Sequence, residues 1–142
     1  VRPTRPALDA RYAVWVREAL DVAAMRAAAQ RLVGEHDYTS FRTVACQSRS
    51  PVRHLYRADA EDQGEIIDWH FEANAFLHHM IRNLVGSLLV VGRGERPPEW
   101  IAEVLAARDR TKAGPTAPPH GLVLMSARYP AEHGLPAEHC LP

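Results

Sequence analysis

Cysteine is scarce in this chain, and the features that mark secreted or membrane-spanning proteins are absent. Its two cysteines, Cys46 and Cys140, stand at a spacing that fits neither a metal-binding motif nor a disulfide framework. The sequence opens without the charged, apolar and small-residue pattern of a secretory leader, and it has no apolar run of about 18 residues. We therefore expect a protein of the reducing cytoplasm without a membrane partner.

An excess of charge of one sign is also missing. The 17 basic and 17 acidic residues cancel, which argues against the overall basic field of many nucleic-acid-binding proteins. The distribution is nevertheless uneven. Residues 1–57 carry ten arginines and five acidic residues, whereas residues 58–72 carry six acidic residues and no lysine or arginine. Sixteen of the basic residues are arginine, whose planar guanidinium suits phosphate, although a GC-rich genome would also favour arginine codons.

The length and composition of the chain fit one globular domain. A length of 142 residues with 46% hydrophobic and 24% charged residues is ordinary for a chain with a single core, and it argues against disorder. Residues 1–10 are rich in proline and arginine, so we expect a linker or tail there. The domain is expected over residues 11–130, and a C-terminal tail over residues 131–142.

The spacing of apolar residues predicts an α+β fold. Helical spacing and capping residues predict three helices. The first spans residues 22–33, between Asp21 and Gly34. The second spans residues 74–91, with Asn74 as its cap, and the third starts at Pro97 and Pro98. Alternation predicts a strand over 65–73, and over 11–17 either a short strand or the entry segment to a sheet. Strands are also expected over 55–60 and 122–129. Polar or proline-rich composition predicts loops over 35–54 and 109–121. This order favours a mixed or antiparallel sheet with helices packed on one face.

The segment ANAFLHHMIRNLVG, residues 73–86, places two histidines and an arginine among apolar residues. Adjacent positions on a helix point about 100° apart, so His78 and His79 are not expected to bind one metal ion together. A metal-dependent hydrolase that also uses His70 is disfavoured by the same spacing. Arg82 needs an acidic or phosphate partner if it is buried, or else it extends its charged end to the surface.

Common catalytic patterns are absent. The sequence has no G-x-S-x-G nucleophile elbow and no glycine-rich phosphate loop. Cys46 lies in the basic loop, and no base is identified that would activate its thiol. A cysteine of this kind is usually a small buried residue. The residues by themselves therefore indicate an α+β domain with an arginine-bearing polar loop and one unexplained internal arginine.

Three segments resemble a known family. The strings GEHDYTSFRT, ANAFLHHMIRNLVGSLLVVGRG and ARDRTKAGPTAPPHGLVLMSARYP are similar, in order and spacing, to the C-terminal half of the TruA family of tRNA pseudouridine synthases. The resemblance implies the fold of that C-terminal domain and an isomerase acting on uridines of the tRNA anticodon stem-loop. Such enzymes break the glycosidic bond between C1′ and N1, rotate the base and rejoin it through C5. No cofactor and no metal is implied.

The family's catalytic aspartate has no counterpart in this sequence. That aspartate stands in the motif R-T-D-x-G, which none of the seven aspartates matches. The chain also opens on VRPTRP without an initiator Met. We therefore expect the C-terminal half of a longer polypeptide, inactive by itself because the N-terminal half and its aspartate are missing. The resemblance implies that Arg82 pairs with that aspartate, keeping the carboxylate ionised and oriented.

The resemblance also implies residues that contact the substrate. Phe76 and Leu77 are expected to form an apolar wall against the flipped uracil, since a target base must leave its stack to be reached. Ordinary core packing is the alternative for both. His79 is expected to approach the same cleft.

Three arginines of the polar loop are expected to bind the RNA backbone. Arg42 resembles a family position close to the cleft, and Arg49 and Arg53 are expected to meet phosphates. The partners implied by the resemblance are tRNA, the N-terminal half of the same polypeptide and a second copy in a homodimer. A non-catalytic RNA-binding module of the same fold remains the alternative function.

Overall fold

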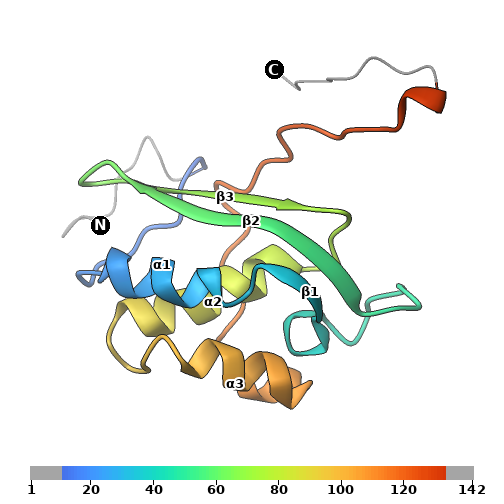
Figure 1. Ribbon diagram of the computed structural model, residues 1–142. Helices are drawn as coiled ribbons and strands as arrows, with labels where there is room; N and C mark the ends of the chain where they lie inside the picture. Colours follow the sequence, from blue (N-terminus) through green and yellow to red (C-terminus); the bar gives the residue numbers. More distant parts are fainter. Residues whose placement is uncertain (1–10, 134–142) are drawn as a thin grey trace.

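An antiparallel sheet and a layer of helices make up the computed structural model, which describes residues 11–133 (Figure 1). Within this range the sheet has three strands in the order β1-β2-β3, formed by Gly34–Asp37, Val52–Asp62 and Ile67–Ala73. The helices lie on one face of the sheet (Figure 1). This arrangement confirms the expected α+β fold. The expected linker over 1–10 and residues 134–142 of the expected tail lie outside the described residues.

Strands β2 and β3 form the main hairpin of the sheet. Ala58 pairs with Phe71 and Ala60 with Trp69, and a register shift lies between Leu55 and Arg57. The short strand β1 pairs with the start of β2 and places His36 opposite Arg53. Alternation puts four acidic residues on the sheet face away from the helices, namely Asp59 and Glu61 of β2 and Asp68 and Glu72 of β3. The hairpin can therefore carry this negative charge outside the core.

Three α-helices, α1 (Val22–Gln30), α2 (Met80–Gly92) and α3 (Trp100–Ala107), build the second layer of the described residues. The side chain of Asp21 caps α1 by accepting a hydrogen bond from the backbone N–H of Ala24 at 2.9 Å, as expected from the sequence. Helix α1 packs against both β2 and α2, and α3 lies farther from the sheet (Figure 1). None of the helices of residues 11–133 is long and apolar enough to cross a membrane.

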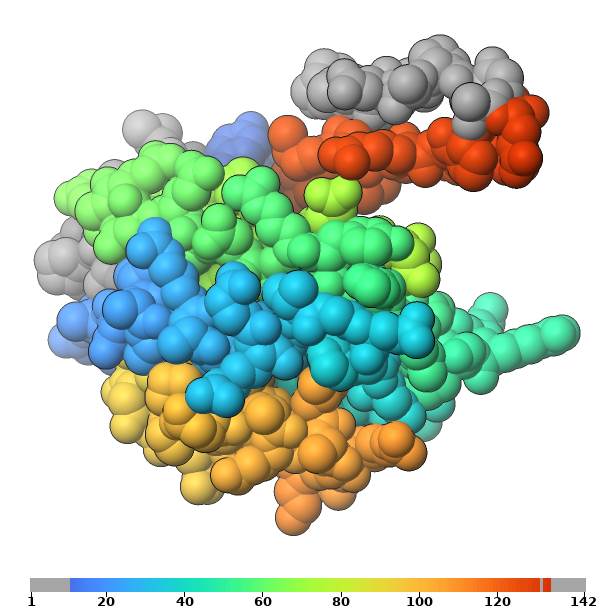
Figure 2. Space-filling model, viewed as in Figure 1, coloured from blue at the N-terminus to red at the C-terminus, as the bar shows by residue number. Residues whose placement is uncertain are grey.

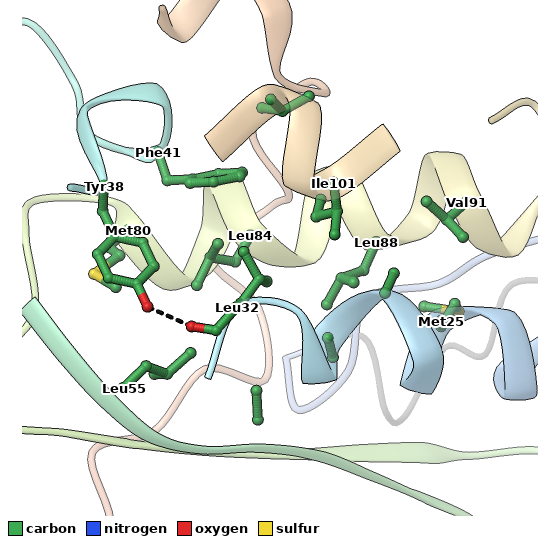
Figure 3. Close-up of a cluster of buried hydrophobic side chains, with 14 of the residues drawn as sticks. Met25, Leu32, Tyr38, Phe41, Leu55, Met80, Leu84, Leu88, Val91 and Ile101 are labelled. Carbon is green, nitrogen blue, oxygen red and sulfur yellow. Dashed lines mark hydrogen bonds between the residues drawn. The ribbon is translucent and has the colours of Figure 1, made fainter. Parts of the chain in front are cut away.

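The core lies between the sheet and the helices (Figure 3). Fully buried side chains of α1, α2 and α3 meet Leu55 of β2 and two aromatic residues of the β1–β2 connection, Tyr38 and Phe41. The Tyr38 hydroxyl donates to the carbonyl of Leu32 at 2.5 Å, so its polar end is satisfied inside the core. The connection between β1 and β2 is thereby anchored to the helical layer.

A short turn and loop after α3 is pressed against α2. The 3-10 turn η2 (Arg110–Lys112) leads into residues 113–117, and a Cβ added to Gly86 of α2 would lie 1.7 Å from the carbonyl oxygen of Pro115. Only glycine permits so close an approach of two backbones. The peptide of Ala117 is bound on both sides by Arg82, since its N–H donates to the Arg82 carbonyl at 3.0 Å and its carbonyl accepts from Arg82 Nε at 2.7 Å.

Two expected strands do not form in the described part of the chain. Residues 11–17 make no ladder, and Tyr12 is 78% exposed although its backbone lies against Gly121. Residues 122–129 are likewise without strand pairing, and their apolar side chains from Leu122 to Met125 are exposed. Arg128 forms an ion pair with Glu72 of β3 at 3.1 Å, which holds this segment beside the strand without a backbone ladder. An apolar or alternating sequence alone does not form a strand, because the backbone also needs a neighbouring strand to bond with.

Three element boundaries also differ from expectation. The expected loop over 35–54 contains β1, the 3-10 turn η1 (Thr39–Phe41) and the start of β2, because β1 is polar and too short to show alternation. Helix α1 ends at Gln30 rather than near Gly34, which has a φ of 113° and begins β1. The helix expected over 74–91 starts at Met80, because His79 has the left-handed conformation and cannot continue a right-handed helix.

Candidate functional site around Arg82

An open hollow of about 1070 Å³ lies between β3, the start of α2 and the segment that follows Gly121. Figure 2 shows this last segment projecting from the body of the molecule above the strands. Of the seven site residues expected from the sequence, four line the hollow: Phe76, Leu77, His79 and Arg82. Arg42, Arg49 and Arg53 are not among its lining residues.

Arg82 lies in the first turn of α2 and is half-buried. Its Nε donates to the Ala117 carbonyl at 2.7 Å, and its Nη1 lies 3.1 Å from Nε2 of His79. Neither partner is a carboxylate. Two neutral acceptors therefore hold the guanidinium at the wall of the hollow. Neither of these two contacts balances its positive charge. The pairing of Arg82 with a catalytic aspartate stays a prediction from the sequence.

The two histidines stand just before α2 rather than on it. Their rings are stacked, with centroids 4.0 Å apart and an interplanar angle of 24°. The expectation that they point about 100° apart is therefore wrong, because it assumed helical geometry. Nδ1 of His78 lies 2.8 Å from the Thr43 hydroxyl. Within residues 11–133, no group of three potential metal ligands lies close enough to hold an ion.

Electrostatics favour a neutral His79. Desolvation lowers the pKa of His79 below its usual range, and the neighbouring His78 and the Arg82 charge lower the pKa further. A guanidinium has no acceptor, so the contact with Arg82 requires that Nε2 of His79 carries a lone pair. The proton of the neutral ring then lies on Nδ1.

The apolar wall residues differ in exposure. Phe76 is 39% exposed at the hollow, whereas Leu77 is 4% exposed and belongs to the hydrophobic core. Trp69 and Phe71 of β3 also line the hollow, with stacked rings whose centroids are 5.6 Å apart. The hollow thus combines aromatic and aliphatic surface with the Arg82 guanidinium, a lining that accommodates a planar, partly polar ring.

The arginines of the β1–β2 connection form a separate group. Arg53 donates from Nη2 to the Ser48 hydroxyl at 2.7 Å and from Nη1 to the Ser50 carbonyl at 3.0 Å, while its buried Nε has no partner. Arg42 lies near the same loop, with Nη1 3.4 Å from the Ser48 carbonyl. Arg49 is exposed. The connection reaches the Arg82 side of the molecule through Thr43, which contacts His78.

Sequence reasoning missed the polar network that fixes the loop beside Arg82. Asn83 is fully buried, and its Nδ2 donates to the Phe41 carbonyl at 2.8 Å. Its Oδ1 accepts from Thr116 Oγ1 at 2.6 Å and from Arg110 Nη2 at 3.1 Å. An amide in an apolar helix is a detectable signal, since buried polar groups are nearly always paired. Ala117, by contrast, left no signal because it acts through its backbone.

Comparisons with known proteins identify the family. Residues 28–130 match the family model described as tRNA pseudouridine synthase. The tRNA pseudouridine synthase A of Paraburkholderia xenovorans (strain LB400) is 55% identical over 137 residues, which cover 96% of this chain and 51% of that protein. The protein of the same name from Stenotrophomonas maltophilia (strain K279a) is also 55% identical, with 96% and 54% covered.

A third relative, the tRNA pseudouridine synthase A of Xanthomonas euvesicatoria pv. vesicatoria (strain 85-10), is 55% identical over 96% of this chain and 53% of its own length. The chain thus spans about half the length of the curated relatives it matches. The matched region contains both β-hairpin strands, all of α2 and α3, and every residue that holds Arg82. The chain belongs to the tRNA pseudouridine synthase family.

Proposed function

We propose that this chain supplies the arginine-bearing half of a tRNA pseudouridine synthase active site, which isomerises uridines of the anticodon stem-loop. The observation that carries the proposal is Arg82, held by Ala117 and His79 at the wall of a hollow large enough for a base. The three relatives at 55% identity bear the name of this activity. The proposal assigns the rest of the site to residues outside 1–142, and it is supported by the chain's matching about half of each relative.

The role proposed for Arg82 is to pair with the catalytic aspartate. A guanidinium beside a carboxylate favours the ionised form and fixes its direction, so the aspartate is ready to act on the ribose or base. None of the seven aspartates of this chain stands in an R-T-D-x-G motif, so the partner is assigned to another part of the polypeptide. No cofactor is needed, because the glycosidic bond is broken and a carbon–carbon bond is made within the same nucleotide.

The hollow is proposed as the site of the flipped uracil. Phe76 is the exposed part of its wall, and buried Leu77 supports that wall from the core. His79 lies at its edge beside Arg82. Arg42, Arg49 and Arg53 are proposed to bind phosphates of the stem-loop outside the hollow, where they position the RNA without selecting the base.

The proposal extends to the state of the protein in the cell. We assign it to the cytoplasm, where tRNA is modified and where cysteine-poor proteins of this kind are common. A homodimer is proposed on the family resemblance alone. Size-exclusion chromatography with light scattering on the protein expressed from its complete reading frame tests the dimer, and a monomeric mass at micromolar concentration would contradict it.

Release of the C5 hydrogen tests the activity, because rejoining the base through C5 displaces that hydrogen. With tRNA labelled by tritium at C5 of uridine, the protein expressed from the complete reading frame is expected to release label, and the 142-residue chain alone is not. Label release by the isolated chain would refute the division of the site. A complete protein that binds the stem-loop without releasing label would instead support the alternative function, a non-catalytic RNA-binding module.

A further inference from the structure

His79 has a backbone conformation that its side chain does not favour. Its φ is 60°, and the only other non-glycine residue of the described chain with a positive φ is Arg108. The left-handed region is unfavourable for residues that carry a Cβ, and such residues tend to occur where the surroundings fix them for a purpose. At this position the conformation ends the β3–α2 connection and directs the imidazole toward Arg82, one turn along the chain.

A row of contacts holds the imidazole in place. The ring of His79 stacks on that of His78, whose Nδ1 contacts the hydroxyl of Thr43 in the β1–β2 connection. The backbone N–H of Thr43 also lies 3.4 Å from the His78 carbonyl. Two segments distant in sequence are thereby joined behind His79. On the other side, Nε2 of His79 accepts from Arg82 Nη1 at 3.1 Å.

We propose that His79 is a positioning residue for Arg82, with His78 and Thr43 bracing its ring; the proposal rests on the function proposed above. Of the five N–H groups of a guanidinium, Nε–H is taken by Ala117 and one N–H of Nη1 by His79. With two bonds fixed, the guanidinium plane cannot turn about its own axis. The N–H groups of Nη2 and the second N–H of Nη1 are left for an oxyanion, which is the fork that a carboxylate binds.

Two substitutions separate this role from a structural one. His79→Asn keeps a residue that tolerates the left-handed conformation, but its side chain is too short to place an acceptor at the position of Nε2. His79→Gln reaches that position with an amide oxygen that accepts and does not titrate. His133→Asn, the same substitution at an exposed histidine, is the matched control.

Kinetics on the protein expressed from the complete reading frame provide the first readout. His79→Asn is expected to lower kcat for tRNA by about 10- to 100-fold with little change in KM, because a misplaced catalytic group slows chemistry and not binding. His79→Gln is expected to recover most of the loss, and His133→Asn to match the original protein. In an Arg82→Ala background, His79→Asn should cost almost nothing, since the residue it positions is gone. An equal cost in both backgrounds overturns the proposal.

A readout independent of activity distinguishes this proposal from the function on which it rests. Rotation about the Cζ–Nη bonds of Arg82 can be followed by nitrogen NMR of the same protein in the absence of RNA. The rotation is expected to be slow in the original protein and in His79→Gln, and fast in His79→Asn. Equally fast rotation in all three would overturn the positioning role even if the enzyme is active. Slow rotation in an inactive enzyme would overturn only the proposed function.

Discussion

Asn83 satisfies three polar groups at once inside the protein. It is fully buried, and its amide joins the Phe41 carbonyl to Thr116 and Arg110. Asn83→Ala leaves the buried Phe41 carbonyl without its side-chain donor and removes the acceptor that Thr116 and Arg110 share, so we expect the free energy of unfolding to fall by about 3 kcal/mol. Urea unfolding followed by circular dichroism measures it.

Asn74 provides the matched control for that substitution. Its Oδ1 accepts from the backbone N–H of His54 at 3.0 Å, but the side chain is exposed, so water can replace the contact. Asn74→Ala is expected to cost no more than about 0.5 kcal/mol. Equal losses for the two substitutions would show that the Asn83 network does not stabilise the fold.

The depressed pKa of His79 gives a pH dependence whose sign can be worked out. Desolvation first, then His78 and Arg82, lower this pKa below its usual value of 6.5. Between the two values the folded protein binds fewer protons than the unfolded chain, so stability falls as the pH falls. The contribution of His79 is therefore complete above about pH 6.5 and is lost as the pH drops through the folded-state pKa.

His79→Gln removes this titration while keeping an acceptor for Arg82. We expect the melting temperature of the variant to fall less than that of the original protein between about pH 7.5 and about pH 5. Differential scanning calorimetry at both pH values gives the comparison. Asn74→Gln replaces one neutral, exposed amide by another, so it serves as the control and should leave the pH dependence of the original protein unchanged.

At the scale of single residues, the sequence indicated Arg82 but not how it is held. A charge between Ile81 and Leu84 stands out because it must find a partner or reach solvent. Its actual partner Ala117 lies 35 positions away and uses only backbone atoms, which no residue type reveals. His79 was placed near the cleft on the family resemblance, whereas its left-handed backbone depends on the surrounding structure.

At the scale of elements, the contact between α2 and the loop after η2 decides where Ala117 lies. A methyl group on Gly86 would overlap the Pro115 carbonyl, with 1.7 Å between the two atoms, and the obstacle is backbone that cannot move alone. Gly86→Ala gains about 1 kcal/mol of helix propensity but forces the loop away from the helix. We expect a net destabilisation of about 2 kcal/mol, with loss of the bonds from Ala117 to Arg82.

Gly64→Ala is the comparison for the Gly86 substitution. Gly64 has a φ of 84° and nothing within 4 Å of an added Cβ, so its cost is backbone strain of about 1 kcal/mol without any collision. Urea unfolding measures stability, and the Arg82 Nε–H signal in an NMR spectrum reports on the bond to Ala117. That signal should change in Gly86→Ala and remain unchanged in Gly64→Ala.

Elements with strong periodicity were predictable, and elements that depend on distant partners were not. The capped helix after Asp21 and the alternating strand β3 carry their own signals. Strand β1 is four polar residues long and exists because β2 lies beside it. Residues 122–129 show the opposite error, since they are rich in apolar residues but form no strand ladder among the described residues.

At the scale of the whole molecule, basic and acidic residues gather on different surfaces, so the net charge does not describe either surface. The net charge of zero hides the basic β1–β2 connection and the acidic outer face of the β2–β3 hairpin. Composition alone therefore argued against RNA binding, while the distribution of arginines allowed it. The long-range field that steers RNA to a basic surface depends on where the charges lie, and it is screened by salt over about 10 Å.

Two arginines are expected to separate chemistry from binding in the protein expressed from the complete reading frame. Arg82 is half-buried and fixed by two hydrogen bonds at the hollow, so Arg82→Ala should lower turnover by about 100-fold or more, with a much smaller effect on tRNA affinity. Arg49 is exposed in the β1–β2 connection. Because it is proposed to neutralise one phosphate, Arg49→Ala should weaken binding and reduce the slope of log affinity against log salt by about 1. Single-turnover rates and filter binding over a series of salt concentrations measure both quantities, and equal effects of the two substitutions on rate and affinity would contradict this division.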